Sequence, residues 1–231
     1  MKSPNRPAPD LATGRPIPYT LRMRYAALAG HFVLVSLPLL GVLLVLVWVF
    51  DTEAQAIAAF RIHKWQNPGF QDVVRFITDW GNLAMYIPFL VLFYRGWKNH
   101  DKRRTRYALA YVAVQVLVCL VLVNLTKMAL GRPRPETREI LHHFLTLDPN
   151  YHSLPSGHTA EIMGSCLALA LWLRQWRTTL LLGLLVAIMG FSRIYLNMHF
   201  PTDVFFGWLF GALAGWTTFV VGRGEDSTHH G

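Results

Sequence analysis

The sequence contains few charged residues and almost no cysteine. Only 15% of its 231 residues are Asp, Glu, Lys or Arg, whereas an average soluble domain has roughly 25%. This deficit argues against an ordinary soluble protein, and the apolar content argues against a disordered chain. The only two cysteines, Cys119 and Cys166, both lie within apolar runs. We interpret them as packing residues, which excludes a small disulfide-stabilised secreted fold.

Long apolar runs take the place of the missing charge. Hydrophobic residues make up 53% of the chain, and they gather in stretches that approach or exceed the ~20 residues needed to cross a bilayer. Six spans are predicted, at residues 26–50, 80–94, 107–126, 156–173, 178–192 and 204–221. The second contains only 15 residues, including Pro88, and needs flanking residues to reach across. The sequence therefore predicts an all-α, polytopic membrane protein with six transmembrane helices.

Residues 51–79 are mixed in polarity. Apolar residues recur there at helical spacing between polar ones, at Phe70, Val73, Val74 and Ile77. This pattern is typical of a helix that lies on a membrane surface. We therefore expect an interfacial helix on the outer face, with a soluble loop containing a helical turn as the alternative.

The net charge of +9 is concentrated in the connections between the spans. Fourteen Lys and Arg residues fall on one side of the predicted topology and eight on the other. Because positive residues favour the cytoplasmic side, residues 1–25 and 223–231 are predicted to be cytoplasmic tails of a single membrane domain, 26–222. Residues 1–25 lack the pattern of a signal peptide. Basic clusters between apolar runs indicate a membrane protein and no nucleic-acid partner.

The outer ends of the predicted spans carry an unusual set of cations. Lys127, Arg134 and Arg193 lie at one membrane boundary, where like charges repel unless an anion lies among them. Arg offers a planar fork for phosphate oxygens, and Lys offers a compact charge. Ser156 and Gly157 begin the fourth span, where a capping hydroxyl and the free N–H groups of the first helical turn favour an anion. These residues predict a phosphate-binding site.

Two histidines flank this predicted site in the chain. Asp203 follows His199 by four residues, and we expect it to accept the Nδ1–H of the imidazole, which leaves Nε2 free as a nucleophile. His158 follows Gly157 directly and is placed to give a proton to a leaving oxygen. With the cations, these residues predict phosphoryl transfer in which protein groups do the work of a metal.

The three segments together resemble the type 2 phosphatidic acid phosphatase (PAP2) superfamily, membrane lipid phosphatases related to the vanadium haloperoxidases. The superfamily pattern K-x6-R-P, P-S-G-H and S-R-x5-H-x3-D is matched without a substitution at residues 127–135, 155–158 and 192–203. The resemblance implies that His199 carries a phosphohistidine and that Asp203 orients it. It also implies a proton-transfer role for His158, no cofactor and no metal. Phosphate oxygens would be held by Lys127, Arg134, Ser156, Gly157 and Arg193.

The same resemblance implies a bacterial inner-membrane phosphatase that acts on a membrane lipid at the periplasmic face. Its reaction would be hydrolysis of a phosphoric monoester or an acid anhydride. Phosphatidylglycerophosphate, undecaprenyl pyrophosphate, phosphatidic acid and lipid A 1-phosphate all remain as substrates, because the motifs read phosphate and not lipid. A lipid-to-lipid phosphotransferase of the same superfamily and a non-catalytic anion channel or transporter are the alternatives. The sequence does not determine the oligomeric state.

Four further residues are candidates for the substrate entrance, namely Arg132, Arg138, His152 and Glu161. The two arginines would widen the anion funnel or remain solvated. Glu161 is an acid within a predicted span, which makes it a functional candidate, although a structural ion pair explains it equally well. The loop histidines lack the ligand spacing of a zinc site.

Overall fold

The computed structural model describes residues 19–137 and 141–223. Every regular element in these ranges is helical, as the sequence predicts. In chain order the elements are α1 (Tyr19–Val49), α2 (Glu53–Gln66), α3 (Pro68–Lys98), α4 (Lys102–Val114), η1 (Gln115–Leu122), α5 (Val123–Leu130), η2 (Pro149–Tyr151), α6 (Gly157–Leu173), α7 (Trp176–Tyr195) and α8 (Pro201–Arg223). The π-helical η1 joins α4 and α5 into one continuous helix, and η2 is a short 3-10 turn.

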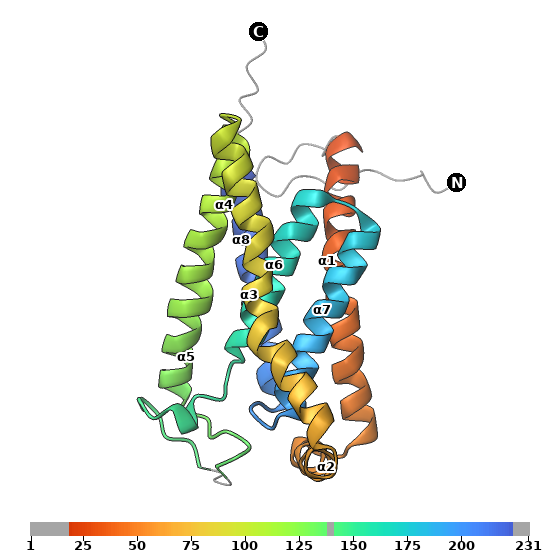
Figure 1. The fold of residues 1–231 in the computed structure, drawn as a ribbon, viewed down its shortest axis with the longest axis vertical. Helices are drawn as coiled ribbons and strands as arrows, with labels where there is room; N and C mark the ends of the chain where they lie inside the picture. Colours follow the sequence, from red (N-terminus) through yellow and green to blue (C-terminus); the bar gives the residue numbers. More distant parts are fainter. Residues whose placement is uncertain (1–18, 138–140, 224–231) are drawn as a thin grey trace, which may run out of the picture.

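Within the described ranges, five helices are long and apolar enough to cross a membrane. They cover Ala26–Val49, Pro68–Lys98, Lys102–Leu130, Trp176–Tyr195 and Pro201–Arg223. The remaining long helix, α6, has 17 residues and is mostly buried. It lies inside the bundle, where it contacts α1, α3, α7, α8 and η1 (Figure 1). The chain is thus a polytopic helical membrane protein built around a short central helix.

The segment 70–77 does not form a separate surface helix. It makes the first turns of α3, which continues through Pro88 to Lys98, as membrane helices permit. With 31 residues at a rise of 1.5 Å each, α3 is about 46 Å long, more than the ~30 Å of a hydrocarbon core. The helix that lies across the bundle axis is α2, which Figure 1 shows end-on.

Close packing of α8 on α6 positions the beginning of α6. A Cβ atom on Gly207 would come within 2.5 Å of the Ser156 carbonyl oxygen, and one on Gly211 within 2.5 Å of the Ala160 carbonyl oxygen. Small residues four apart allow two helix backbones to approach in a membrane. The Ser156 N–H also donates to the Asp203 carbonyl oxygen at 2.9 Å. The first turns of α6 and α8 are therefore held together.

Two residues in the left-handed region turn the chain at the ends of α5 and α7. Gly131 (φ 52°) follows α5 directly, and a Cβ atom there would overlap the His143 carbonyl group. Asn197 (φ 57°) lies between α7 and α8, and Asn tolerates this conformation better than most residues. These turns direct the following loops back across the same end of the bundle.

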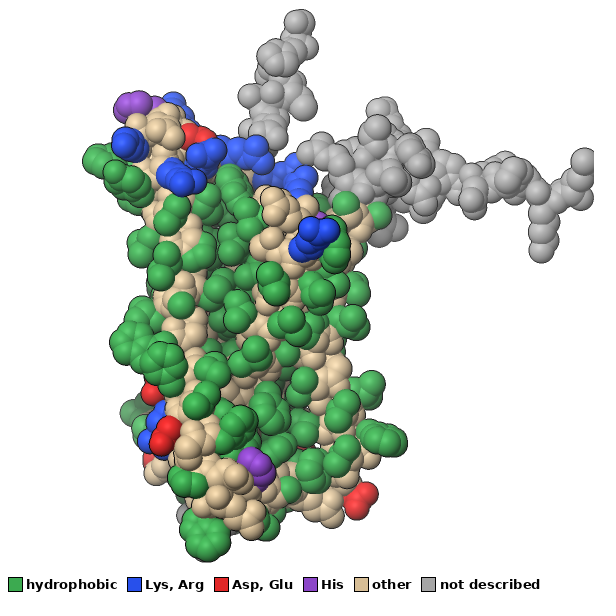
Figure 2. All heavy atoms as spheres, turned by 45° about the vertical axis from the view of Figure 1, so that its right-hand side comes forward, with side chains coloured by type: hydrophobic (Ala, Val, Ile, Leu, Met, Phe, Trp, Pro, Cys, Tyr) green, Lys and Arg blue, Asp and Glu red, His purple; other side chains and the backbone are tan. Residues whose placement is uncertain are grey.

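The two ends of the bundle differ in character. α1 begins and α8 ends at the upper end of Figure 1. Figure 2 shows Lys and Arg side chains gathered at this end, above a largely hydrophobic middle. The loops that follow α5 and α7, together with α2, lie at the opposite end (Figure 1). The candidate site residues belong to that opposite end.

Candidate active site

The structure brings the three motif segments together. His199 N–H donates to the Arg193 carbonyl oxygen at 3.2 Å, and His199 Nδ1 lies 2.7 Å from the Ser153 carbonyl oxygen. A Cβ atom built on Gly157 would lie 3.3 Å from Lys127 Nζ. The end of α5, the start of α6 and the turn from α7 to α8 therefore surround one site.

The His199 imidazole is buried, with only 2% of its surface exposed. Its Nδ1–H donates to the Ser153 carbonyl oxygen, while the Asp203 Oδ2 atom is 3.7 Å from Nδ1. The nearest acceptor of the Nδ1–H is therefore the Ser153 carbonyl oxygen and not the expected Asp203, whose carboxylate is a charged neighbour of the imidazole. With the proton on Nδ1, Nε2 keeps its lone pair.

Burial lowers the pKa of His199 to about 4. The Asp203 carboxylate acts in the opposite direction, and the nearby cations Arg193 and Lys127 lower the pKa further. The imidazole is therefore neutral at physiological pH, which is the form that a nucleophile requires.

Asp203 is fully buried and organises the groups around His199. Its Oδ2 accepts from the Ser153 hydroxyl at 2.5 Å and from the Phe200 N–H at 2.8 Å. Its Oδ1 accepts from Arg132 at 2.7 Å. Asp203 therefore holds both the residue whose carbonyl binds His199 and the turn that carries His199.

Arg132 binds other side chains of the protein. One of its terminal nitrogens donates to Asp203 and to the Thr202 hydroxyl, and the other donates to Glu53 at 2.9 Å. Its guanidinium also lies 4.5 Å from the centre of the Phe200 ring. Every assigned contact turns this arginine toward α2 and α8, so it acts as a structural partner of Asp203.

The anion-binding groups surround the first turn of α6. Ser156 caps this helix, because its hydroxyl accepts from the Thr159 N–H at 3.4 Å and from the Thr159 hydroxyl at 2.9 Å. The next N–H groups of the turn, with the helix dipole behind them, favour an anion. The cation Lys127 lies beside Gly157.

Arg193 is a buried cation with an unpartnered donor. Only 4% of its surface is exposed, and its Nε has no hydrogen-bond acceptor among the described residues. Burying a guanidinium without an anion is costly. Arg134 lies nearby, with its Nε on the Pro149 carbonyl oxygen at 3.1 Å. Burial lowers the pKa of Arg134, an effect that Glu136 and Asp203 oppose. The arrangement fits an anion that accepts hydrogen bonds from several sides.

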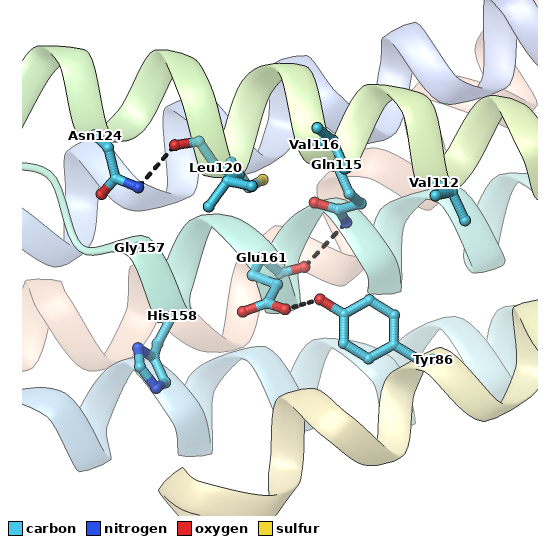
Figure 3. Close-up of a pocket in the computed structure, with 10 residues that line it drawn as sticks. Tyr86, Val112, Gln115, Val116, Leu120, Asn124, Gly157, His158 and Glu161 are labelled. Atoms are coloured by element: carbon cyan, nitrogen blue, oxygen red, sulfur yellow. Dashed lines mark hydrogen bonds between the residues drawn. The ribbon is translucent and has the colours of Figure 1, made fainter.

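His158 projects from the first turn of α6 beside a cavity of about 330 Å³ (Figure 3). His158 directly follows Gly157, which lies beside Lys127, so it borders the anion site as well. The cavity is lined by Tyr86, Val112, Gln115, Val116, Cys119, Leu120, Asn124, Gly157, His158 and Glu161. His158 therefore separates the anion site from a mainly apolar cavity.

Glu161 lies in this cavity and has only neutral partners. Asn82 Nδ2 donates to its Oε2 at 2.7 Å, and the Tyr86 hydroxyl donates to its Oε1. Among the residues that the structure describes, no Lys or Arg forms a salt bridge with it. In place of the ion pair that was one alternative for this acid, two uncharged side chains from α3 stabilise the carboxylate.

The two remaining substrate-entrance candidates are His152 and Arg138. His152 Nε2 lies 3.0 Å from the Thr146 carbonyl oxygen, within the loop that joins α5 to α6. Arg138 lies outside the described residues. In the described ranges, no group of three or more His, Cys, Asp or Glu residues could hold a metal ion.

Sequence reasoning missed several residues that support the site. Ser153 and Glu53 are the clearest. Ser153 contacts the motif residues His199 and Asp203, and Glu53 binds Arg132, the partner of Asp203, from a distant part of the chain. Gln115 and Asn82 border Glu161 in the same way. The spacing of residues within one segment does not predict contacts with distant segments. A polar residue in an apolar run, such as Gln115, is the one sign that was available.

Known proteins resemble this chain over the segments that form the site. Residues 104–225, more than half of the chain, match the PAP2 superfamily. An undecaprenyl-diphosphatase from Sulfolobus acidocaldarius is 27% identical over 149 residues, which cover 63% of this chain and 66% of that protein. A lipid A 1-phosphatase from Rhizobium johnstonii is 27% identical over 160 residues, which cover 63% of this chain and 65% of that protein.

The chain thus spans slightly less than two thirds of the length of these two relatives. No solved structure gives a significant match. The match to the superfamily extends from the start of α4 to the end of α8 and includes every motif residue described above. The chain therefore belongs to the PAP2 superfamily.

Proposed function

We propose that this protein is an integral membrane phosphatase that hydrolyses a lipid phosphate or lipid pyrophosphate. The observation that carries the proposal is the pairing of a buried, neutral His199 with a buried Arg193 whose Nε lacks an acceptor. A phosphate group supplies that acceptor and places phosphorus near the imidazole. The similarity to an undecaprenyl-diphosphatase and to lipid A 1-phosphatases supports a lipid-linked phosphate as the substrate class.

The reaction proceeds in two steps. In the first, His199 Nε2 attacks phosphorus and forms a P–N bond, while the bond from phosphorus to the leaving oxygen breaks and His158 gives its proton to that oxygen. The leaving oxygen belongs to a lipid alcohol in a monoester and to a lipid monophosphate in a pyrophosphate. In the second, neutral His158 takes a proton from water, whose oxygen attacks phosphorus and breaks the P–N bond. Inorganic phosphate leaves, and both histidines return to their starting states. The Ser153 carbonyl and Asp203 stabilise the positive charge that develops on His199.

The phosphate oxygens are held throughout by fixed donors. These are the side chains of Lys127, Arg134 and Arg193, the hydroxyl of Ser156, and the N–H groups of the first turn of α6 from Gly157 onward. Donors that are aimed in advance at the oxygens stabilise the transition state without reorganisation. We propose no metal in this step, so activity should survive a strong chelator such as EDTA. Complete loss with EDTA would contradict this part.

The proposed topology has six spans, namely the five long apolar helices and the shorter α6, which is the fourth span in chain order. Both termini lie in the cytoplasm, and the site faces the periplasm across a bacterial inner membrane. The excess of Lys and Arg on the side of the termini supports this orientation. α2 is the proposed interfacial helix, because it crosses the bundle axis (Figure 1) and exposes Ile62 and Trp65.

The test is release of inorganic phosphate by the purified protein in detergent. A panel of lipid monophosphates and diphosphates is offered to the wild type, to His199→Ala and to His142→Ala, an exposed histidine of the loop after α5. We expect phosphate release by the wild type and His142→Ala, and loss of at least about a thousandfold in His199→Ala. Activity in a folded His199→Ala protein would remove the proposed nucleophile.

A further inference from the structure

The cavity beside His158 contains a set of hydrogen-bond acceptors that the proposed reaction does not use. Glu161 lies one helical turn beyond His158 on α6, about 4.5 Å further along the helix axis. Figure 3 shows its carboxylate beside the Tyr86 hydroxyl of α3, while Gln115 of η1 binds the Glu161 backbone carbonyl oxygen. A carboxylate can accept about four hydrogen bonds, and Glu161 receives two, from Asn82 and Tyr86. It can therefore accept more.

Gln115 adds an acceptor without a partner. The side chain is 6% exposed, its Nε2 donates to the Glu161 carbonyl oxygen and to the Ser165 hydroxyl, and its Oε1 has no partner. Asn124, on the same wall, uses its Nδ2 on the Leu120 carbonyl oxygen at 2.7 Å. The polar groups that remain on this side of the cavity are thus mainly oxygens.

The π-helical segment η1 supplies much of this wall. Gln115, Val116, Cys119 and Leu120 all belong to it and all line the cavity. π-helical turns are rare and are found frequently at functional sites. The wall that faces Glu161 is therefore an unusual piece of backbone, next to the groups that carry out the proposed chemistry.

The two ends of the site have opposite hydrogen-bonding character. Around the phosphate, Lys127, Arg193 and the first turn of α6 offer donors. One turn further along α6, Glu161 and Gln115 offer acceptors, and no Lys or Arg of the described ranges pairs with the carboxylate. A second phosphate beside the leaving oxygen would be repelled by Glu161, whereas hydroxyl or amide donors would be bound.

We infer that this cavity holds the leaving group and selects one that bears a hydroxyl or N–H donor next to the phosphate ester. The substrate class is a phosphate monoester of a polyol or sugar lipid, in preference to a lipid diphosphate. Glu161 and Gln115 are the specificity-determining residues. The inference rests on the proposed phosphatase activity and adds to it the chemistry of the substrate.

The test uses a matched pair of substrates with full-length protein in detergent. One is a monoalkyl glycerol phosphate with a free middle hydroxyl, and the other is the same molecule with that hydroxyl methylated. Farnesyl diphosphate is the third substrate, and p-nitrophenyl phosphate reports phosphate transfer without a lipid. We expect the wild type to prefer the free hydroxyl by about tenfold in kcat/KM, the value of one good hydrogen bond.

Glu161→Gln should bring this ratio close to one and raise the relative rate with farnesyl diphosphate. Glu136→Gln makes the same chemical change at an acid that is 59% exposed and pairs with Lys64, and it should keep the wild-type ratio. Equal rates for the matched pair in the wild type, a ratio unchanged in Glu161→Gln, or faster turnover of farnesyl diphosphate would each overturn the inference. The wild-type ratio decides alone if Glu161→Gln does not fold. Absence of phosphate release from every substrate would instead contradict the proposed function.

Discussion

Arg132 and Asp203 form an ion pair of 2.7 Å in which the carboxylate is completely buried. The same guanidinium binds Glu53 at the start of α2, and Asp203 binds the Ser153 hydroxyl. A chain of contacts therefore runs from α2 through the loop after α5 to the carbonyl group that holds His199. The orientation of the imidazole depends on side chains that do not face the anion site.

Arg132→Gln should lower kcat more than it raises KM. The variant leaves the buried Asp203 carboxylate without its cation, and breaking such a pair costs about 3–5 kcal/mol of stability. We expect kcat to fall about tenfold or more and the melting temperature to decrease. Steady-state kinetics and thermal unfolding in detergent measure both.

Glu53→Gln is the matched control for this change. It removes the outer partner of Arg132 and leaves the pair with Asp203, so its effects should be smaller on both measurements. A rise in KM with unchanged kcat in Arg132→Gln would show that this arginine binds substrate, contrary to its position in the structure.

Vanadate or phosphate should stabilise the wild-type fold. Arg193 is buried with an unpartnered Nε, and an anion that binds only the native state adds about 2.7 kcal/mol at a hundred times its Kd. Arg193→Ala should lose most of this stabilisation. Without an anion, its melting temperature should differ less from that of the wild type than it does with vanadate, because the lost interaction is with the anion. A full vanadate shift in Arg193→Ala would place the anion elsewhere.

Gly207→Ala should reduce both stability and activity. The added methyl group would meet the Ser156 carbonyl oxygen at 2.5 Å, so α8 has to move away from the beginning of α6, and overpacking of this kind typically costs about 1–3 kcal/mol. The movement displaces Ser156 relative to Asp203. Gly41→Ala is the control, because nothing lies within 4 Å of a Cβ atom there. Equal phosphate release and equal melting temperatures for the two variants would contradict this account of the helix contact.

Apolar run lengths predicted the helical membrane fold, but they did not predict where α3 begins. Residues 70–77 alternate in polarity as a surface helix does, yet they continue into the apolar part of α3. A helix longer than the bilayer core needs mixed-polarity residues outside the core and apolar residues within it. The pattern alone therefore does not distinguish a surface helix followed by a separate span from one continuous helix. The short α6 differs in the other direction. Its apolar residues are buried against the other helices of the bundle, so its apolar run does not have to reach the length of a lipid-facing span.

The motif segments predicted which residues meet, but not every contact between them. His199 and Asp203 are four residues apart, which indicates a direct hydrogen bond, but Ser153 lies closer to the imidazole. Arg132 is one of several cations in its loop, and the pattern that singles out Arg134 gives no role to Arg132. Its partner Glu53 is 79 residues away. Contacts of this kind depend on how loops pack, which spacing within a segment does not encode.

The acid limb of kcat/KM should lie well below the ordinary range of histidine. Burial and the neighbouring cations lower the pKa of His199 from 6.5 to about 4, and only the neutral imidazole can attack phosphorus. Activity should therefore remain as the pH falls through 6.5 and decline as it approaches about 4. Phosphate release from a single lipid substrate across this range, with stability checked at each pH, measures the limb.

Stability gives an independent reading of the same pKa. Between pH 6.5 and about 4, the unfolded chain protonates this histidine while the native state does not, so the unfolded state binds more protons and the free energy of unfolding falls as the pH falls. His199→Gln has no such group. The wild type should therefore lose more stability than His199→Gln across this interval. Equal losses in the two proteins, or an acid limb of kcat/KM near pH 6.5, would contradict the lowered pKa. Either result would mean that the imidazole is solvated and that the cations lie too far away to act on it.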